Sequence, residues 1–137
     1  MEGVGHARIE EEAGEFFISL RRPLGVTALG LNQIVLRPRQ RLRIHRHRHQ
    51  DEVYLVLRGT LTVEFDGGEL MTLGPGELVS VAARVRRQLS NRGEEPCVIV
   101  AMGASGEHES RDGEAFADWS ETEPRPPQEV PLPPDLD

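Results

Sequence analysis

Short apolar runs separated by turn residues make up the middle of the chain. The runs recur about every 8 to 12 residues, a spacing typical of a β-sandwich or small barrel. They cover residues 26–36, 41–47, 53–57, 61–65, 69–73, 78–82, 85–89 and 97–101, with turn signals such as Arg58-Gly59 and Gly74-Pro75-Gly76 between them. None of this region keeps a helical period over three turns. We therefore predict an all-β fold, a single antiparallel β-barrel or jelly roll.

The last third of the chain has a different composition. Most of the 10 prolines follow Ser120, which predicts an extended or loosely attached tail. Before the tail, residues 112–120 predict one short helix, capped by Asp112, with Phe116 and Trp119 on one face. We expect one domain over residues 1–137, with a core barrel over about 14–102 and a C-terminal extension over 103–137 that is partly helical and then proline-rich.

The length and net charge of the chain exclude several classes of protein. A chain of 137 residues can bury roughly two thirds of its unfolded surface in one core, and this length excludes a second domain. The net charge of −7 argues against a general nucleic-acid binder. No apolar run approaches the roughly 18 residues of a membrane-spanning helix, and no signal-peptide pattern opens the chain. The single Cys97 lies in an apolar run and is expected in the core. We expect a cytoplasmic protein that binds neither nucleic acid nor membrane.

One short segment combines imidazole, guanidinium and carboxylate side chains. Residues 41–52 read Arg-Leu-Arg-Ile-His-Arg-His-Arg-His-Gln-Asp-Glu. Alternate side chains of a strand share a face, so His45 and His47 are neighbours, and a turn before the next strand brings Glu52 beside them. Two histidines and one carboxylate form a facial triad that leaves positions on a divalent metal open. A solvated basic strand edge is the other interpretation of the same pattern.

The spacing of the histidines and the glutamate matches a sequence signature of a known family. The order His-x-His-x4-Glu-x6-Gly, at His45, His47, Glu52 and Gly59, resembles the first signature of the cupin superfamily. Arg39 takes the place of the leading glycine of that signature. The segment also resembles the metal strand of small mannose-6-phosphate-isomerase-like cupins. The resemblance implies a jelly-roll fold with a metal held by the two histidines and the glutamate, and it leaves His49 as an intervening residue.

A second cupin signature, Gly-x5-Pro-x-Gly-x2-His-x3-Asn, can be placed over residues 76–91 without a gap. Gly76 and Asn91 match it, whereas Ala82, Arg84 and Arg87 replace its proline, glycine and histidine. In a typical metal-binding cupin that histidine supplies the fourth protein ligand. A guanidinium carries a permanent charge and has no acceptor atom, so Arg87 cannot coordinate a cation.

Three arrangements of Arg87 remain open at this point. In the first, a metal binds at His45, His47 and Glu52 while Arg87 holds a substrate anion. In the second, Arg87 pairs with Glu52 in a metal-free pocket for an anionic molecule. In the third, Arg87 turns to solvent beside an open site with three ligands. If the parity of the strand continues to His45, Arg41 and Arg43 point toward one end of the cavity, which favours an acidic ligand. The alternative is that both arginines lie beyond the rim of the barrel and are solvated.

The resemblance and the residues together imply a metal-dependent enzyme of the oxygenase or isomerase type that acts on an anionic metabolite. The expected cofactor is a divalent transition metal: Fe, Mn, Ni, Co or Zn. Tyr54 and Arg87 are candidate catalytic residues, and Arg87, Arg43 and Tyr54 are candidate substrate-binding residues. The resemblance also implies a homodimer, in which residues 16–20 form a strand added to the partner's sheet. The alternative function is a non-catalytic binding or sensor cupin with a metal-free, arginine-lined pocket.

Overall fold

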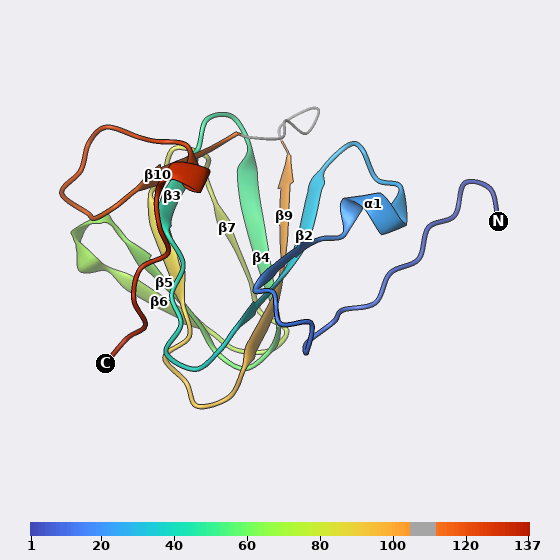
Figure 1. The fold of residues 1–137 in the computed structure, drawn as a ribbon, viewed down its shortest axis with the longest axis horizontal. Helices are drawn as coiled ribbons and strands as arrows, with labels where there is room; N and C mark the ends of the chain where they lie inside the picture. The colour runs from blue at the N-terminus through green and yellow to red at the C-terminus, as the bar shows by residue number, and fades with distance from the viewer. Residues whose placement is uncertain (105–111) are drawn as a thin grey trace.

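The computed structural model describes residues 1–104 and 112–137 and shows two five-stranded antiparallel sheets facing one another (Figure 1). One sheet has the order β1 (Phe17–Ser19), β2 (Gly30–Leu36), β9 (Cys97–Ala104), β4 (Asp51–Arg58) and β7 (Leu78–Val81). The other has the order β10 (Gly113–Phe116), β3 (Ile44–His47), β8 (Arg87–Ser90), β5 (Leu61–Phe65) and β6 (Leu70–Leu73). Short helical turns are α1 (Arg21–Leu24), η1 (Asp66–Gly68) and η2 (Pro127–Glu129). The predicted all-β jelly-roll architecture is confirmed, and every strand predicted in the middle of the chain is present.

The core lies between the two sheets and follows the alternation of the strands. Its members are the inward-facing apolar residues of both sheets, among them Leu36, Val56, Leu61, Val63, Leu89 and Ile99. Cys97 belongs to this cluster and is fully buried, which raises the pKa of its thiol to about 12. The thiol is therefore a packing group, as predicted. In the described part of the chain, no helix is long and apolar enough to span a membrane.

Positions of the cupin signatures other than the candidate metal ligands lie in tight turns. Gly59 has φ 77°, and a Cβ there would lie 2.3 Å from the carbonyl oxygen of Pro96. Asn91 is fully buried, and its side-chain amide donates to the carbonyl oxygens of Leu36 and Glu95. Arg39, which replaces the leading glycine, has φ 72°. A left-handed backbone explains why glycine suits this position, and here an arginine adopts that conformation at a cost in strain.

The predicted helix over residues 112–120 is wrong, because residues 113–116 form strand β10 along the edge of β3. Asp112 caps no helix; its carboxylate accepts the backbone N–H groups of His49 and Gln50. Phe116 is buried, and its ring lies beneath the guanidinium of Arg86. Pairing with an otherwise open strand edge outweighs the weak helical preference of a segment that contains Gly113.

The proline-rich tail is extended, as predicted, but it is not loosely attached. It runs beside β3 in Figure 1, and backbone and side-chain hydrogen bonds fix it there. Arg41 Nε donates to the carbonyl oxygen of Pro134 at 2.8 Å, and Arg43 Nε donates to that of Val130 at 2.6 Å. Val130 itself is 2% exposed. The arginines before the histidines therefore hold the C-terminal segment on the second sheet.

The N-terminal strand is present where the sequence places it. β1 pairs with β2 of the same chain, with Ile18 opposite Gln33. Before β1 the chain stays in contact with this sheet, because the backbone of Glu10 exchanges two hydrogen bonds with the Gln33 side chain and Glu11 pairs with Arg58. The first few residues extend away from the sheets toward the N-terminus (Figure 1). Exchange of this strand with a second copy, and with it the homodimer, stays a prediction, as do the limits of the core and the C-terminal extension.

Gly59 and Gly67 provide a matched test of the turn geometry. Both have positive φ, but a Cβ at Gly67 would meet no atom within 4 Å. We expect G67A to lower the free energy of unfolding by about 1 kcal/mol through backbone strain alone. G59A should cost roughly 3 kcal/mol, because overpacking against residue 96 adds to the strain. Urea unfolding followed by circular dichroism measures both, and equal losses in the two variants would contradict the close approach at Gly59.

Candidate metal centre

Two neighbouring segments bring His45, His47 and Glu52 together. His45 and His47 lie on the same face of β3, and Glu52 lies on β4 after the tight connection through residues 48–50. The Nε2 atoms of His45 and His47 lie 3.5 Å and 3.3 Å from Glu52 Oε1. The possible ligand atoms of the three residues all lie within 4.8 Å of one another. The strand alternation read from the sequence is therefore the geometry observed.

His47 has the environment of a metal-binding histidine. Both of its ring nitrogens are buried, and neither has a hydrogen-bond partner in the described part of the chain. An unsatisfied buried polar atom is costly, and a cation bound at Nε2 would satisfy it. Asp112 Oδ2 lies 3.6 Å from Nδ1, on the other side of the ring. A carboxylate behind a metal-bound imidazole fixes its orientation and tautomer, so this donor set fits a divalent cation.

Arg87 lies behind the glutamate and is fully buried. Its Nη2 donates to Glu52 Oε1 at 2.9 Å, and its Nε donates to the Tyr54 hydroxyl oxygen at 3.1 Å. Nη1 donates to the carbonyl oxygen of Val85 at 2.7 Å. The arrangement with Arg87 turned to solvent is therefore wrong, and the pairing of Arg87 with Glu52 is the one observed.

The contacts of the Glu52 carboxylate converge on one of its oxygens. Oε1 accepts from Arg87 and from the hydroxyl of Tyr54, and it faces both histidines. Within the described residues these contacts all fall on Oε1. Tyr54 is 1% exposed. It is thus both a buried strand aromatic and a polar contact of the site.

Burial and hydrogen bonding shift the pKa values of this cluster. Burial alone would raise the pKa of Glu52, but its hydrogen bond with His45 and the close approach of the His47 ring hold it well below its ordinary value. Burial lowers the pKa of His45, and the hydrogen bond to Glu52 offsets this only in part. Burial also raises the pKa of Tyr54 well above its ordinary value, so its hydroxyl stays protonated and donates. A neutral imidazole beside an ionised carboxylate is the protonation state that binds metals.

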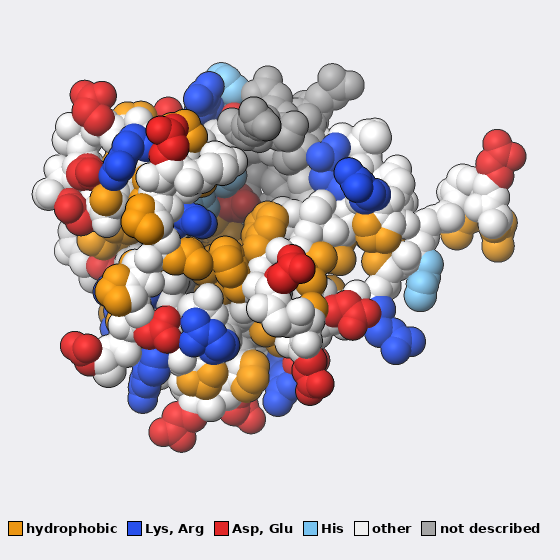
Figure 2. Space-filling model, in the orientation of Figure 1, with side chains coloured by type: hydrophobic (Ala, Val, Ile, Leu, Met, Phe, Trp, Pro, Cys, Tyr) orange, Lys and Arg blue, Asp and Glu red, His pale blue; other side chains and the backbone are white. Residues whose placement is uncertain are grey.

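A cavity of about 540 Å³ opens over the cluster. Figure 2 shows a hollow with apolar side chains on its wall and acidic, basic and histidine side chains inside it. The wall includes His45, His47, Glu52 and Arg43, together with residues of β1, β2 and the C-terminal segment. Arg41, Tyr54 and Arg87 are not among its lining residues. Arg41 binds the C-terminal tail through its Nε group. Direct contact of Tyr54 or Arg87 with a substrate stays a prediction.

Sequence reasoning missed several residues of this cavity. Arg21 reaches it from α1, Phe17 from β1, Gln128 from the C-terminal segment and Asp112 from the start of β10. Each of them is far in sequence from the histidines, so no local spacing connects them. An inward-facing position on the N-terminal strand is the one signal that was available, and it applies to Phe17 alone.

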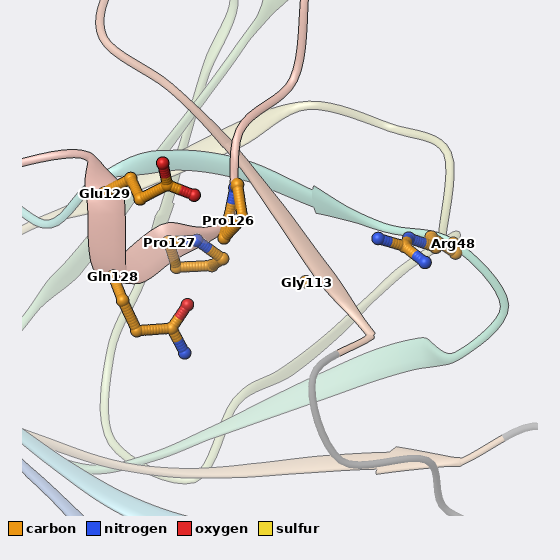
Figure 3. A pocket seen from close by; sticks show the side chains of 6 residues that line it. All are labelled: Arg48, Gly113, Pro126, Pro127, Gln128 and Glu129. Atoms are coloured by element: carbon orange, nitrogen blue, oxygen red, sulfur yellow. The ribbon is translucent and has the colours of Figure 1, made fainter.

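A second cavity, of about 420 Å³, lies between the start of β10 and the C-terminal segment. Its wall consists of Arg48, Gly113, Pro126, Pro127, Gln128 and Glu129. In Figure 3 the prolines and Gln128 come from the tail, while Arg48 lies on the far side of β10. The three candidate metal ligands are absent from this wall, so the chemistry of the site belongs to the larger cavity.

Comparison with known proteins agrees with the fold. The cupin domain family model matches residues 32–103, so this chain belongs to the cupin domain family. No curated protein matches the chain. A cupin protein from Bacteroides fragilis has a similar structure, with 20% identity, a TM-score of 0.66, and coverage of 80% of this chain and 89% of that chain. A Cupin 2 conserved barrel domain protein from Salinispora arenicola shares 18% identity over 73% of this chain and 88% of its own, with a TM-score of 0.62. Identities this low show the fold alone.

The pKa shifts predict how acid affects the metal-free protein. Since folding lowers the pKa of His45, stability should begin to fall as the pH drops below about 6.5, its ordinary value. The stabilisation from Glu52 is present above its unfolded pKa, about 4.3, and is lost as the pH falls through its lower folded pKa. Urea unfolding from neutral to acid pH measures both phases. E52Q should remove the second phase, whereas E64Q, at a residue paired 3.6 Å from Arg92, should keep it. An unchanged acid slope in E52Q would exclude this origin.

Proposed function

We propose that this chain binds a divalent transition metal through His45, His47 and Glu52, and that it catalyses a reaction of the oxygenase or isomerase type on an anionic small molecule. The observation that carries the proposal is the buried His47 ring, which has no hydrogen-bond partner in the described chain and lies beside an ionised glutamate on a cavity wall. Fe, Mn, Ni, Co and Zn all accept this donor set.

Three protein ligands leave positions on the metal open for a substrate or oxygen, and the metal would polarise a hydroxyl or carbonyl group there. The protein supplies the rest. Arg87 fixes the Glu52 carboxylate from behind, and the protonated Tyr54 hydroxyl donates to the same oxygen. Arg43 adds positive charge to the cavity wall while its Nε is held by Val130. This arrangement orients the ligands and attracts an anion.

One observation favours a second function, a binding or sensor protein without a metal. The ion pair between Arg87 and Glu52 neutralises the single carboxylate of the cluster without any cation. The pocket would then hold an anionic small molecule through its arginines alone. Elemental analysis separates the two functions, because the second one requires no metal at the histidines.

The metal proposal is tested by replacing one histidine at a time. Protein purified without a His tag or chelator should carry close to one equivalent of transition metal, and H47A should lose it. His49 is the matched control, because it lies two residues further on, is exposed and is absent from the candidate ligand cluster. H49A should keep the metal. Absence of metal from the parent protein, even after supplementation with Mn and Fe, would exclude the metalloenzyme and support the binding function.

Arg87 should set the strength of metal binding. R87H replaces a fixed positive charge by a possible fourth ligand, so the affinity for the metal should rise by about 10-fold or more. Competition with a chelator measures the affinity, and R86H, at the neighbouring arginine that pairs with Asp66, provides the control. R87H also removes three donors from a buried position, so the melting temperature of each variant is measured alongside. A lower affinity in a folded R87H would show that the guanidinium assists the metal.

A further inference from the structure

The wall of the larger cavity has an apolar side that the metal cluster does not use. Phe17 faces inward from the edge strand β1 and is 47% exposed, although Ile34, its partner across the strands, is 4% exposed. Phe16 and Leu42 line the same cavity. The rings of Phe16 and Phe17 meet edge to face with their centroids 6.5 Å apart. An aromatic ring left half-open at a cavity is a surface that gains from an apolar ligand.

Arg21 supplies a polar group on the same wall. Its Nε is buried and has no hydrogen-bond partner in the part of the chain that the structure describes. Arg21 and Arg43, the two arginines of this wall, also have no ion pair within the described residues. A buried guanidinium nitrogen without an acceptor is costly, and a ligand oxygen would satisfy it.

The acidic residues of this wall, in contrast, already have partners. Glu52 pairs with Arg87, and Asp51 accepts the backbone N–H of Ala83. Asp112 accepts the N–H groups of the turn before β4. None of these carboxylates pairs with Arg21 or Arg43, so within the described residues both guanidinium groups remain able to pair with a ligand anion, even though the chain as a whole is acidic.

We infer that the cavity binds a small organic carboxylate with an apolar body, with the carboxylate on Arg21 and the body against Phe17. The inference rests on the proposed function and names the ligand class of the same site. A hydroxyl-rich ligand, such as a sugar phosphate, would lose hydrogen bonds to water against Phe16, Phe17 and Leu42. A flat aromatic or branched aliphatic acid buries that surface and satisfies the guanidinium.

Calorimetric titration of the full chain with three probes tests the inference. The probes are phenylacetate, its neutral isostere phenylacetamide, and inorganic phosphate. Phenylacetate should bind about 10-fold more tightly than either of the others, the effect expected of one charge-assisted hydrogen bond on an apolar contact. R21Q should abolish the preference for the acid over the amide. R22Q is the matched control, because Arg22 is exposed and does not line the cavity, and it should keep the preference. F17A should weaken the acid and the amide equally.

Equal preferences in R21Q and R22Q would overturn the inference, and so would phosphate binding as tightly as phenylacetate. Failure of phenylacetate to bind at millimolar concentration overturns it as well. Metal content measured on the same samples, and on H47A, keeps the two proposals apart. A preference for the acid that persists in metal-free H47A supports the ligand class independently of the metal. Metal retained in a protein that does not distinguish the acid from the amide leaves the metal site standing and removes the ligand class.

Discussion

The buried ion pair between Arg87 and Glu52 determines how the rest of the site is arranged. A guanidinium with no exposed surface is tolerated only where its charge is neutralised and its donors are bonded. Here Glu52, Tyr54 and the carbonyl oxygen of Val85 meet those requirements. The register of the sheet brings the guanidinium to this place, because Arg87 on β8 lies directly opposite His45 on β3. A side chain that projects from this position must approach the histidines whatever its chemistry, which is why its replacement changes the character of the whole cluster.

Two other arginines, Arg41 and Arg43, hold the C-terminal segment in place. The alternation that places His45 and His47 on one face also places Arg41 and Arg43 on it, yet their Nε groups bind the C-terminal segment. The tail then closes part of the cavity with Gln128 and shields the edge of the second sheet together with β10. Arg41 and Arg43 therefore attach the C-terminal segment to the second sheet. These contacts explain the cluster of arginines without a bound nucleic acid.

Patterns local in sequence were predictable, and contacts between distant segments were not. The period of two gave the strands and the cluster of His45, His47 and Glu52, because both depend on residues a few positions apart. The error at residues 112–120 arose because pairing with β3 decides that segment, and no short-range signal reports it. Proline content predicted an extended tail correctly, but its attachment depends on arginines some 90 residues earlier. The position of Arg21 on the cavity wall could not be predicted for the same reason.

The substitution of arginine for histidine has a thermodynamic consequence that connects the metal and the ligand. With a metal bound, the site carries one more positive charge than the same site with a neutral histidine at position 87, since Glu52 is already shared with the guanidinium. Repulsion between these cations would weaken metal binding in an empty cavity, and a carboxylate bound in the cavity would relieve it. The factor by which the anion would raise the affinity for the metal equals the factor by which the metal would raise the affinity for the anion, because coupling between two binding events is reciprocal. With both proposed ligands, the buried Arg87 would thus make the metal and the acid each strengthen the binding of the other.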